Sequence, residues 1–158
     1  MTMKRRTFLQ GAATGAVISV AVGAGLLTPR MVLAVWPKGA FEAKSAGDAL
    51  KDLLGSDQTM TSDAITLKVP DIAENGAVVP VTISTTLSDV ESISIVVEKN
   101  ATPLTSSFIL GKGTEGFIST RIKMGKTSNV IGVVKVKGEG KLYSAAKEVK
   151  VTLGGCGG

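Results

Sequence analysis

The sequence predicts an all-β protein, a small antiparallel sandwich that follows an N-terminal helix. From residue 65 to residue 153, apolar side chains alternate with polar ones, as they do in strands that bury one face. Stretches rich in Gly, Asn and Pro divide this alternation into short runs. About seven short strands at this spacing are typical of an immunoglobulin-like β-sandwich.

The first predicted element is a helix that ends at Gly55. Glycine is the residue that most often follows the last turn of a helix, and a polar segment, residues 56–59, comes next. Apolar side chains recur at helical spacing before it, which predicts one buried stripe. The stripe consists of Phe41, Ala46, Ala49, Leu50, Leu53 and Leu54.

The strands are predicted from apolar runs with a period of two. Pro80 lies in the second run and predicts a sheet edge or a bulge, because proline cannot donate a backbone hydrogen bond. Turns are predicted at residues 74–76, 99–103, 111–113 and 137–140. The runs are Ile65, Leu67 and Val69; Val79, Val81 and Ile83; Ile93, Ile95 and Val97; Phe108 and Leu110; Ile118, Thr120, Ile122 and Met124; residues 130–136; and Val149, Val151 and Leu153.

Residues 1–34 are predicted to be an export signal. Arg5 and Arg6, followed by Thr-Phe-Leu, resemble the twin-arginine motif, and no residue from Thr7 to Pro29 is charged. The small residues that end at Ala34 predict cleavage after that residue, which would leave a periplasmic protein without stable membrane insertion. An uncleaved N-terminal anchor is the alternative; the glycine content of the stretch argues against it.

The net charge of +5 belongs mostly to this signal. Residues 1–34 contain four basic residues and no acidic one, so 14 of the 18 basic residues remain against 13 acidic ones. A balance of +1 gives no reason to expect a nucleic-acid partner. The chain has no histidine and one cysteine, which excludes Ser-His-Asp catalysis, histidine-ligated metals and thiolate clusters within it. We expect no cofactor. Because twin-arginine export usually carries folded proteins, we expect a protein partner.

The one cysteine predicts where the chemistry lies. Cys156 stands between Gly154 and Gly155 on one side and Gly157 and Gly158 on the other, beyond the last predicted strand. Glycine accepts almost any backbone conformation, so residues 154–158 are predicted to form a flexible arm beyond the domain of residues 35–153. Three extended residues reach about 10 Å. A thiolate presented in this way suits a covalently bound cargo, and no general base can be assigned beside it for catalysis in place.

Several alternatives for Cys156 remain open. The protein could be an exported structural β-sandwich that dimerises through this thiol, a subunit whose active site lies on a partner, or a chain with an incidental cysteine. Prenylation requires cysteine fourth from the end, and here it is third. A lipoprotein cysteine would directly follow the signal. A terminal thiocarboxylate on Gly158, as in ubiquitin-like sulfur carriers, conflicts with the export signal and with seven strands.

Together these features resemble the SoxY family of the bacterial Sox thiosulfate-oxidation system. The resemblance runs through the arginine pair, residues 71–76, 120–124 and 147–151, and the terminal Gly-Gly-Cys-Gly-Gly. It implies a carrier that is not itself an enzyme, paired with a SoxZ-like subunit as a heterodimer. It also implies that SoxAX-like haem proteins join thiosulfate to Cys156, and that SoxB-like and SoxCD-like enzymes process the bound sulfur. The four glycines are then the arm.

Overall fold

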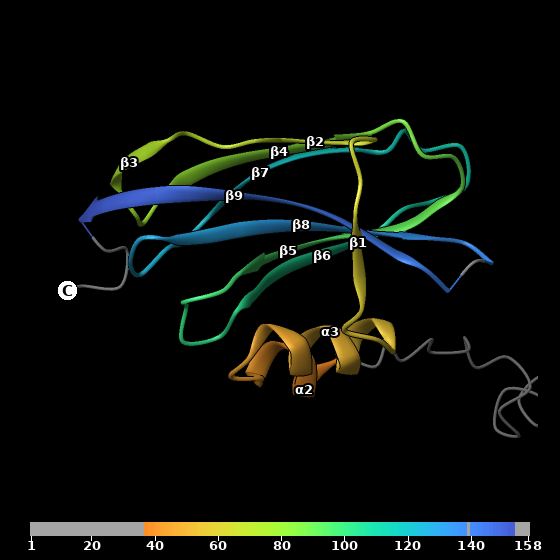
Figure 1. Ribbon diagram of the computed structural model, residues 1–158, viewed down its shortest axis with the longest axis horizontal. Coiled ribbons are helices and arrows are strands. Elements are labelled where there is room, and N and C mark those ends of the chain that lie inside the picture. The colour runs from red at the N-terminus through yellow and green to blue at the C-terminus, as the bar shows by residue number, and fades with distance from the viewer. Residues whose placement is uncertain (1–36, 139, 154–158) are drawn as a thin grey trace, which may run out of the picture. The chain divides into compact units, whose positions relative to one another are not determined.

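A computed structural model describes residues 37–138 and 140–153 (Figure 1). The predicted export signal, its cleavage site and residues 154–158 lie outside the described residues. Within the described part, none of the helices has the length and apolar character needed to cross a membrane.

Two β-sheets pack face to face, and the helices cover the outer face of the larger one (Figure 1). The predicted β-sandwich is confirmed, and all seven predicted strands are present. The smaller sheet has the order β2 (Ile65–Lys68), β4 (Val79–Thr85) and β7 (Phe117–Ile122). The larger sheet has the order β1 (Thr59–Thr61), β9 (Leu142–Leu153), β8 (Ser128–Val136), β5 (Val90–Val97) and β6 (Leu104–Ile109), and β3 (Ile72–Asn75) also pairs with β9.

The single predicted helix is wrong in one respect, because the structure has two helices, α2 (Lys38–Glu42) and α3 (Ala46–Leu54). The break comes at Ser45, whose backbone is extended and whose Oγ accepts a hydrogen bond from the Asp48 amide at 3.1 Å. This N-cap satisfies a backbone donor that a continuous helix would not leave free. The predicted end is confirmed: Gly55 has a φ of 85° and closes α3 in the left-handed conformation.

Two short strands, β1 and β3, were not predicted. They have three and four residues and few apolar side chains, so they leave almost no alternation in the sequence. Both pair with the 12-residue β9 in parallel, β1 with residues 142–144 and β3 with residues 150–153, whereas the seven predicted strands pair antiparallel among themselves. The predicted turn at residues 74–76 begins as the end of β3, and Asn75 Oδ1 then accepts the Ala77 amide hydrogen at 2.8 Å.

The main core lies between the two sheets and the second beneath the helices. The interior is filled by fully buried aliphatic side chains such as Ile83, Ile95 and Val134, and a smaller cluster joins α3 to the outer face of the larger sheet. The predicted sheet edge at Pro80 is confirmed at that residue, although β4 is the middle strand of the smaller sheet. β2 pairs only with residues 82–85 of β4, so β4 has a partner on one side alone at Pro80.

Candidate functional site

The predicted attachment site, Cys156, and the flanking Gly154, Gly155, Gly157 and Gly158 lie outside the described residues. The structure does describe the place from which the predicted arm leaves the domain. We call that place the arm base. It consists of the end of β9 at Leu153, with β3 on one side and the loop between β7 and β8 on the other.

On one side of the arm base, β3 pairs with β9 as far as Leu153, the last described residue of the chain. Ala73 pairs with Val151, and Asn75 pairs with Leu153. The Gly76 amide donates to the Leu153 carbonyl at 2.7 Å, and Thr152 Oγ1 donates to the Glu74 carbonyl at 2.8 Å. The β9 backbone therefore stays in a hydrogen-bonded ladder up to Leu153.

On the other side, the β7–β8 loop continues where β8 stops. The β8–β9 register ends at Ser128 and Val149. The Val151 amide donates beyond it to Thr127 Oγ1 at 3.0 Å, so this side chain stands in for one more strand residue. Gly76 links the same loop to the arm base, because its carbonyl accepts the Met124 amide hydrogen at 2.7 Å.

A lysine on β9 fastens the connection that leads into β3. Lys147 Nζ lies 2.9 Å from Asp71 Oδ1 and donates to the Val69 carbonyl at 3.1 Å. The hydrogen bond and the positive charge of Lys147 hold the pKa of the Asp71 carboxyl below its ordinary value. The Lys150 amide also donates to the Asp71 carbonyl at 2.9 Å, so two residues of β9 hold this segment.

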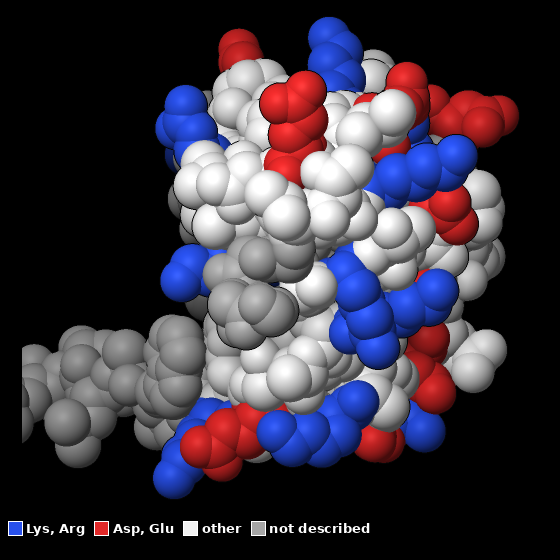
Figure 2. All heavy atoms as spheres, turned by 90° about the vertical axis from the view of Figure 1, so that its left-hand side faces the viewer, with Lys and Arg blue, Asp and Glu red and all other residues white. Residues whose placement is uncertain are grey.

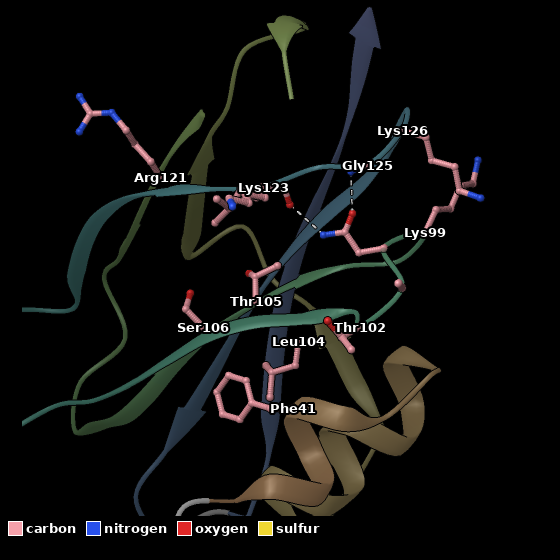
Figure 3. A pocket seen from close by; sticks show the side chains of 13 residues that line it. Phe41, Lys99, Thr102, Leu104, Thr105, Ser106, Arg121, Lys123, Gly125 and Lys126 are labelled. Carbon is pink, nitrogen blue, oxygen red and sulfur yellow. Dashed lines mark hydrogen bonds between the residues drawn. The ribbon is translucent and has the colours of Figure 1, made fainter. Parts of the chain in front are cut away.

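A groove of about 640 Å³ opens at this end of the sandwich, between the edge strands β6 and β7 (Figure 3). The β5–β6 turn and the β7–β8 loop close one end of it. Asn100 joins these two segments: its Nδ2 donates to the Lys123 carbonyl at 2.8 Å, and its Oδ1 accepts the Gly125 amide hydrogen at 3.0 Å.

The groove is lined with positive charge. Lys99, Arg121, Lys123 and Lys126 line it, and no acidic residue does. Among the described residues, none of these four cations forms an ion pair, whereas Lys51, Lys135 and Lys147 each do. Figure 2 shows the end of the sandwich from which β9 leaves, with one group of basic side chains to the right of the centre of this face.

One hydroxyl in the groove also lacks a partner. Ser106 Oγ is buried and makes no hydrogen bond within the part of the chain that the structure describes. Ser106 lines the groove from β6, and Figure 3 shows it below Arg121. Sequence reasoning missed this groove, because its walls come from separate segments. The only signal was the presence of lysines in the predicted turn at 99–103 and near residue 124.

The described residues contain no group of three or more His, Cys, Asp and Glu side chains that could hold a metal ion.

No curated protein matches the chain. Two matches to solved structures are distant and carry no inference. One is to a chain from a study of T cell specificity and activation by the bacterial superantigen toxic shock syndrome toxin-1, with 8% identity, a TM-score of 0.39 and coverage of 54% of this chain and 99% of that one. The other is to a lytic polysaccharide monooxygenase of Jonesia denitrificans, with 11% identity, a TM-score of 0.37 and coverage of 60% and 58%.

A third solved structure is much more similar. It is the sulfur carrier protein SoxY from Chlorobium limicola f thiosulfatophilum, with 42% identity and a TM-score of 0.60, covering 67% of this chain and 94% of that one. The family model of the sulfur oxidation protein SoxY matches residues 50–156, a span that includes both the arm base and Cys156. The chain therefore belongs to the SoxY family of sulfur oxidation proteins.

Proposed function

We propose that this protein is a periplasmic covalent sulfur carrier in thiosulfate oxidation and that Cys156 is its attachment site. One observation carries the proposal: Cys156 lies three residues beyond Leu153, where β9 is hydrogen-bonded to β3 and, through Gly76, linked to the β7–β8 loop. Membership of the SoxY family and the likeness to a sulfur carrier protein support it.

In this proposal, the hydrogen-bonded arm base and the glycine-rich residues 154–158 have different roles in a carrier. The base fixes the place from which the thiol starts, and the two glycines on each side of Cys156 leave its sulfur unshielded for narrow active sites. The domain itself is the substrate-bearing subunit and not an enzyme. Its chemistry is supplied by its partners.

The proposed cycle has two balanced steps on this sulfur. The Cys156 thiolate and thiosulfate form a new S–S bond and release an electron pair to a c-type haem protein of the SoxAX kind, which gives Cys–S–S–SO₃⁻. Water then attacks the terminal sulfur on a SoxB-like hydrolase, and the S–SO₃ bond breaks. Sulfate and protons leave, and a persulfide, Cys–S–S⁻, stays on the arm. A SoxCD-like enzyme then oxidises the persulfide sulfur, or this sulfur passes to sulfur storage.

A SoxZ-like subunit completes the carrier as a heterodimer.

The variant Cys156→Ser tests the proposal. It should abolish thiosulfate-dependent oxygen uptake by cells whose own gene is replaced, while export and thermal unfolding of the protein stay unchanged. Ser144→Ala is a control on the larger sheet, where it removes a hydroxyl that donates to Thr59 Oγ1 at 3.1 Å and leaves Cys156 unchanged. Full activity of Cys156→Ser would overturn the carrier proposal. A wild-type protein found only as a disulfide dimer with no sulfur adduct would favour the structural alternative.

A further inference from the structure

We propose that the cationic groove holds the anionic end of the cargo on Cys156, so that the sulfonate-bearing arm rests against its own domain. The cationic groove is the one lined by Lys99, Arg121, Lys123 and Lys126. This inference rests on the proposed function, because it needs Cys156 to carry a sulfur oxyanion.

The groove lies within reach of the arm base. One glycine connects the two, because Gly76 accepts the Met124 amide hydrogen and donates its own to Leu153. Gly125 follows Met124 directly and lines the groove. Residues 154–156 span up to about 10 Å when extended, and the cargo projects beyond the sulfur. The end of the groove nearest the arm base is therefore the one formed by the β7–β8 loop.

That end carries the densest positive charge. The Lys99 amide donates to Ser128 Oγ at 3.0 Å, which places the β5–β6 turn beside the β8 start that follows Lys126. Figure 3 shows Lys99 and Lys126 together on this side, with Arg121 at the other. Because none of the four is paired with a carboxylate among the described residues, a bound oxyanion would replace only solvent at these ammonium and guanidinium groups. Charge-assisted hydrogen bonds to such oxygens are stronger than neutral ones.

The groove is also built to hold its shape. The paired hydrogen bonds of Asn100 fix the β5–β6 turn to the β7–β8 loop, so the backbones that carry Lys99 and Lys126 are already side by side before an anion binds. Ser106, whose buried Oγ makes no hydrogen bond within the described residues, lines the groove on the Arg121 side and leaves that part of it polar. Tethering to Cys156 makes binding intramolecular, which gives a weak site a high effective concentration of ligand.

The proposal makes the arm position depend on the cargo. Cys–S–S–SO₃⁻ carries a sulfonate that matches several cations, whereas the bare thiol does not. Removal of the sulfonate as sulfate leaves only the smaller persulfide anion and weakens the contact. The loaded arm is thus held until a partner enzyme competes for it, and the processed arm is released.

The test loads the exported protein without any partner enzyme. The Cys156 thiolate attacks an inner sulfur of tetrathionate, forms Cys–S–S–SO₃⁻ and displaces thiosulfate, so no other oxidant is needed. In the ¹⁵N-labelled protein, loading should shift the amide signals of Lys99, Gly125 and Lys126. The double variant Lys99→Gln/Lys126→Gln should lose these shifts. Its adduct should also be reduced by a neutral thiol about fivefold faster, the factor for about 1 kcal/mol lost with two exposed charge pairs.

Lys112→Gln/Lys137→Gln is the matched control. It removes two lysines that line a different pocket, around the β6–β7 connection and the turn after β8, and it should behave as wild type. No shift in the loaded wild type, or equal shifts in both double variants, would overturn the inference. Either result leaves the carrier proposal standing, because chemical loading does not depend on it. Full activity of Cys156→Ser would instead overturn the carrier proposal, whatever the groove does.

Discussion

The hydroxyl of Thr127 offers a direct way to loosen the base of the arm. It accepts the Val151 amide hydrogen at 3.0 Å, just beyond the last β8–β9 residue pair. Replacing Thr127 with valine keeps the shape of the side chain and removes this acceptor. The Val151 amide then lies beside a methyl group.

The expected cost follows from the kind of bond that is lost. A neutral hydrogen bond contributes about 0.5–1.5 kcal/mol net, and an unsatisfied buried donor costs about 1–3 kcal/mol. Both residues are only half-buried, so water can partly replace the hydroxyl, and about 1 kcal/mol is expected. If the amide exchanges through local opening, its protection against hydrogen exchange should fall about fivefold.

Hydrogen exchange followed by NMR measures this loss residue by residue. Thr127→Ser should restore most of the protection, because the hydroxyl returns. Thr82→Val should leave Val151 unaffected, since Thr82 Oγ1 bonds Ser119 Oγ at 3.1 Å on the smaller sheet. Unchanged protection of Val151 in Thr127→Val would refute the idea that this side chain extends the ladder to the arm base.

Three further predictions follow from particular contacts. A Cβ at Gly132 would lie 2.7 Å from Ile83 Cδ1, so Gly132→Ala should lower the free energy of unfolding in urea by about 1–3 kcal/mol. The loss should be smaller in an Ile83→Val background, which lacks the Cδ1 atom, and equal losses in both backgrounds would contradict the clash. Because Lys147 lowers the Asp71 pKa, wild type should have a larger free energy of unfolding than Asp71→Asn at neutral pH. This difference should disappear as the pH falls through the lowered pKa, below about 3.9, and a difference that grows in acid would contradict the prediction. Gly155→Val should slow thiosulfate-dependent turnover and leave the melting temperature unchanged, whereas equal turnover would show that the enzymes do not need a narrow arm there.

Much of the fold was predictable, because strands such as β2 and β4 bury alternate side chains and leave that period in the sequence. The break before α3 was not predicted, because the apolar stripe continues across Ser45, although a serine three residues before Asp48 is an N-cap signal. β1 and β3 are short and polar, and their pairing with β9 depends on the tertiary fold.

The candidate site also has one part that the sequence predicts and one part that it does not. Cys156 could be singled out because a glycine-flanked cysteine is unusual in a linear sequence. The cationic groove could not, because Lys99 and Lys126 are 27 positions apart and meet only through the packing of two turns and the side chain of Asn100. The chemistry of a single residue can be read locally, whereas a surface made by several segments requires the fold.

Intact mass spectrometry of the protein purified from cells oxidising thiosulfate tests the central claim most directly. The carrier account predicts sulfur-containing adducts of the exported chain that map to Cys156 and disappear on treatment with a reductant. A chain that carries no sulfur adduct during active thiosulfate oxidation, with a free Cys156 thiol or only a stable disulfide dimer, would contradict the account.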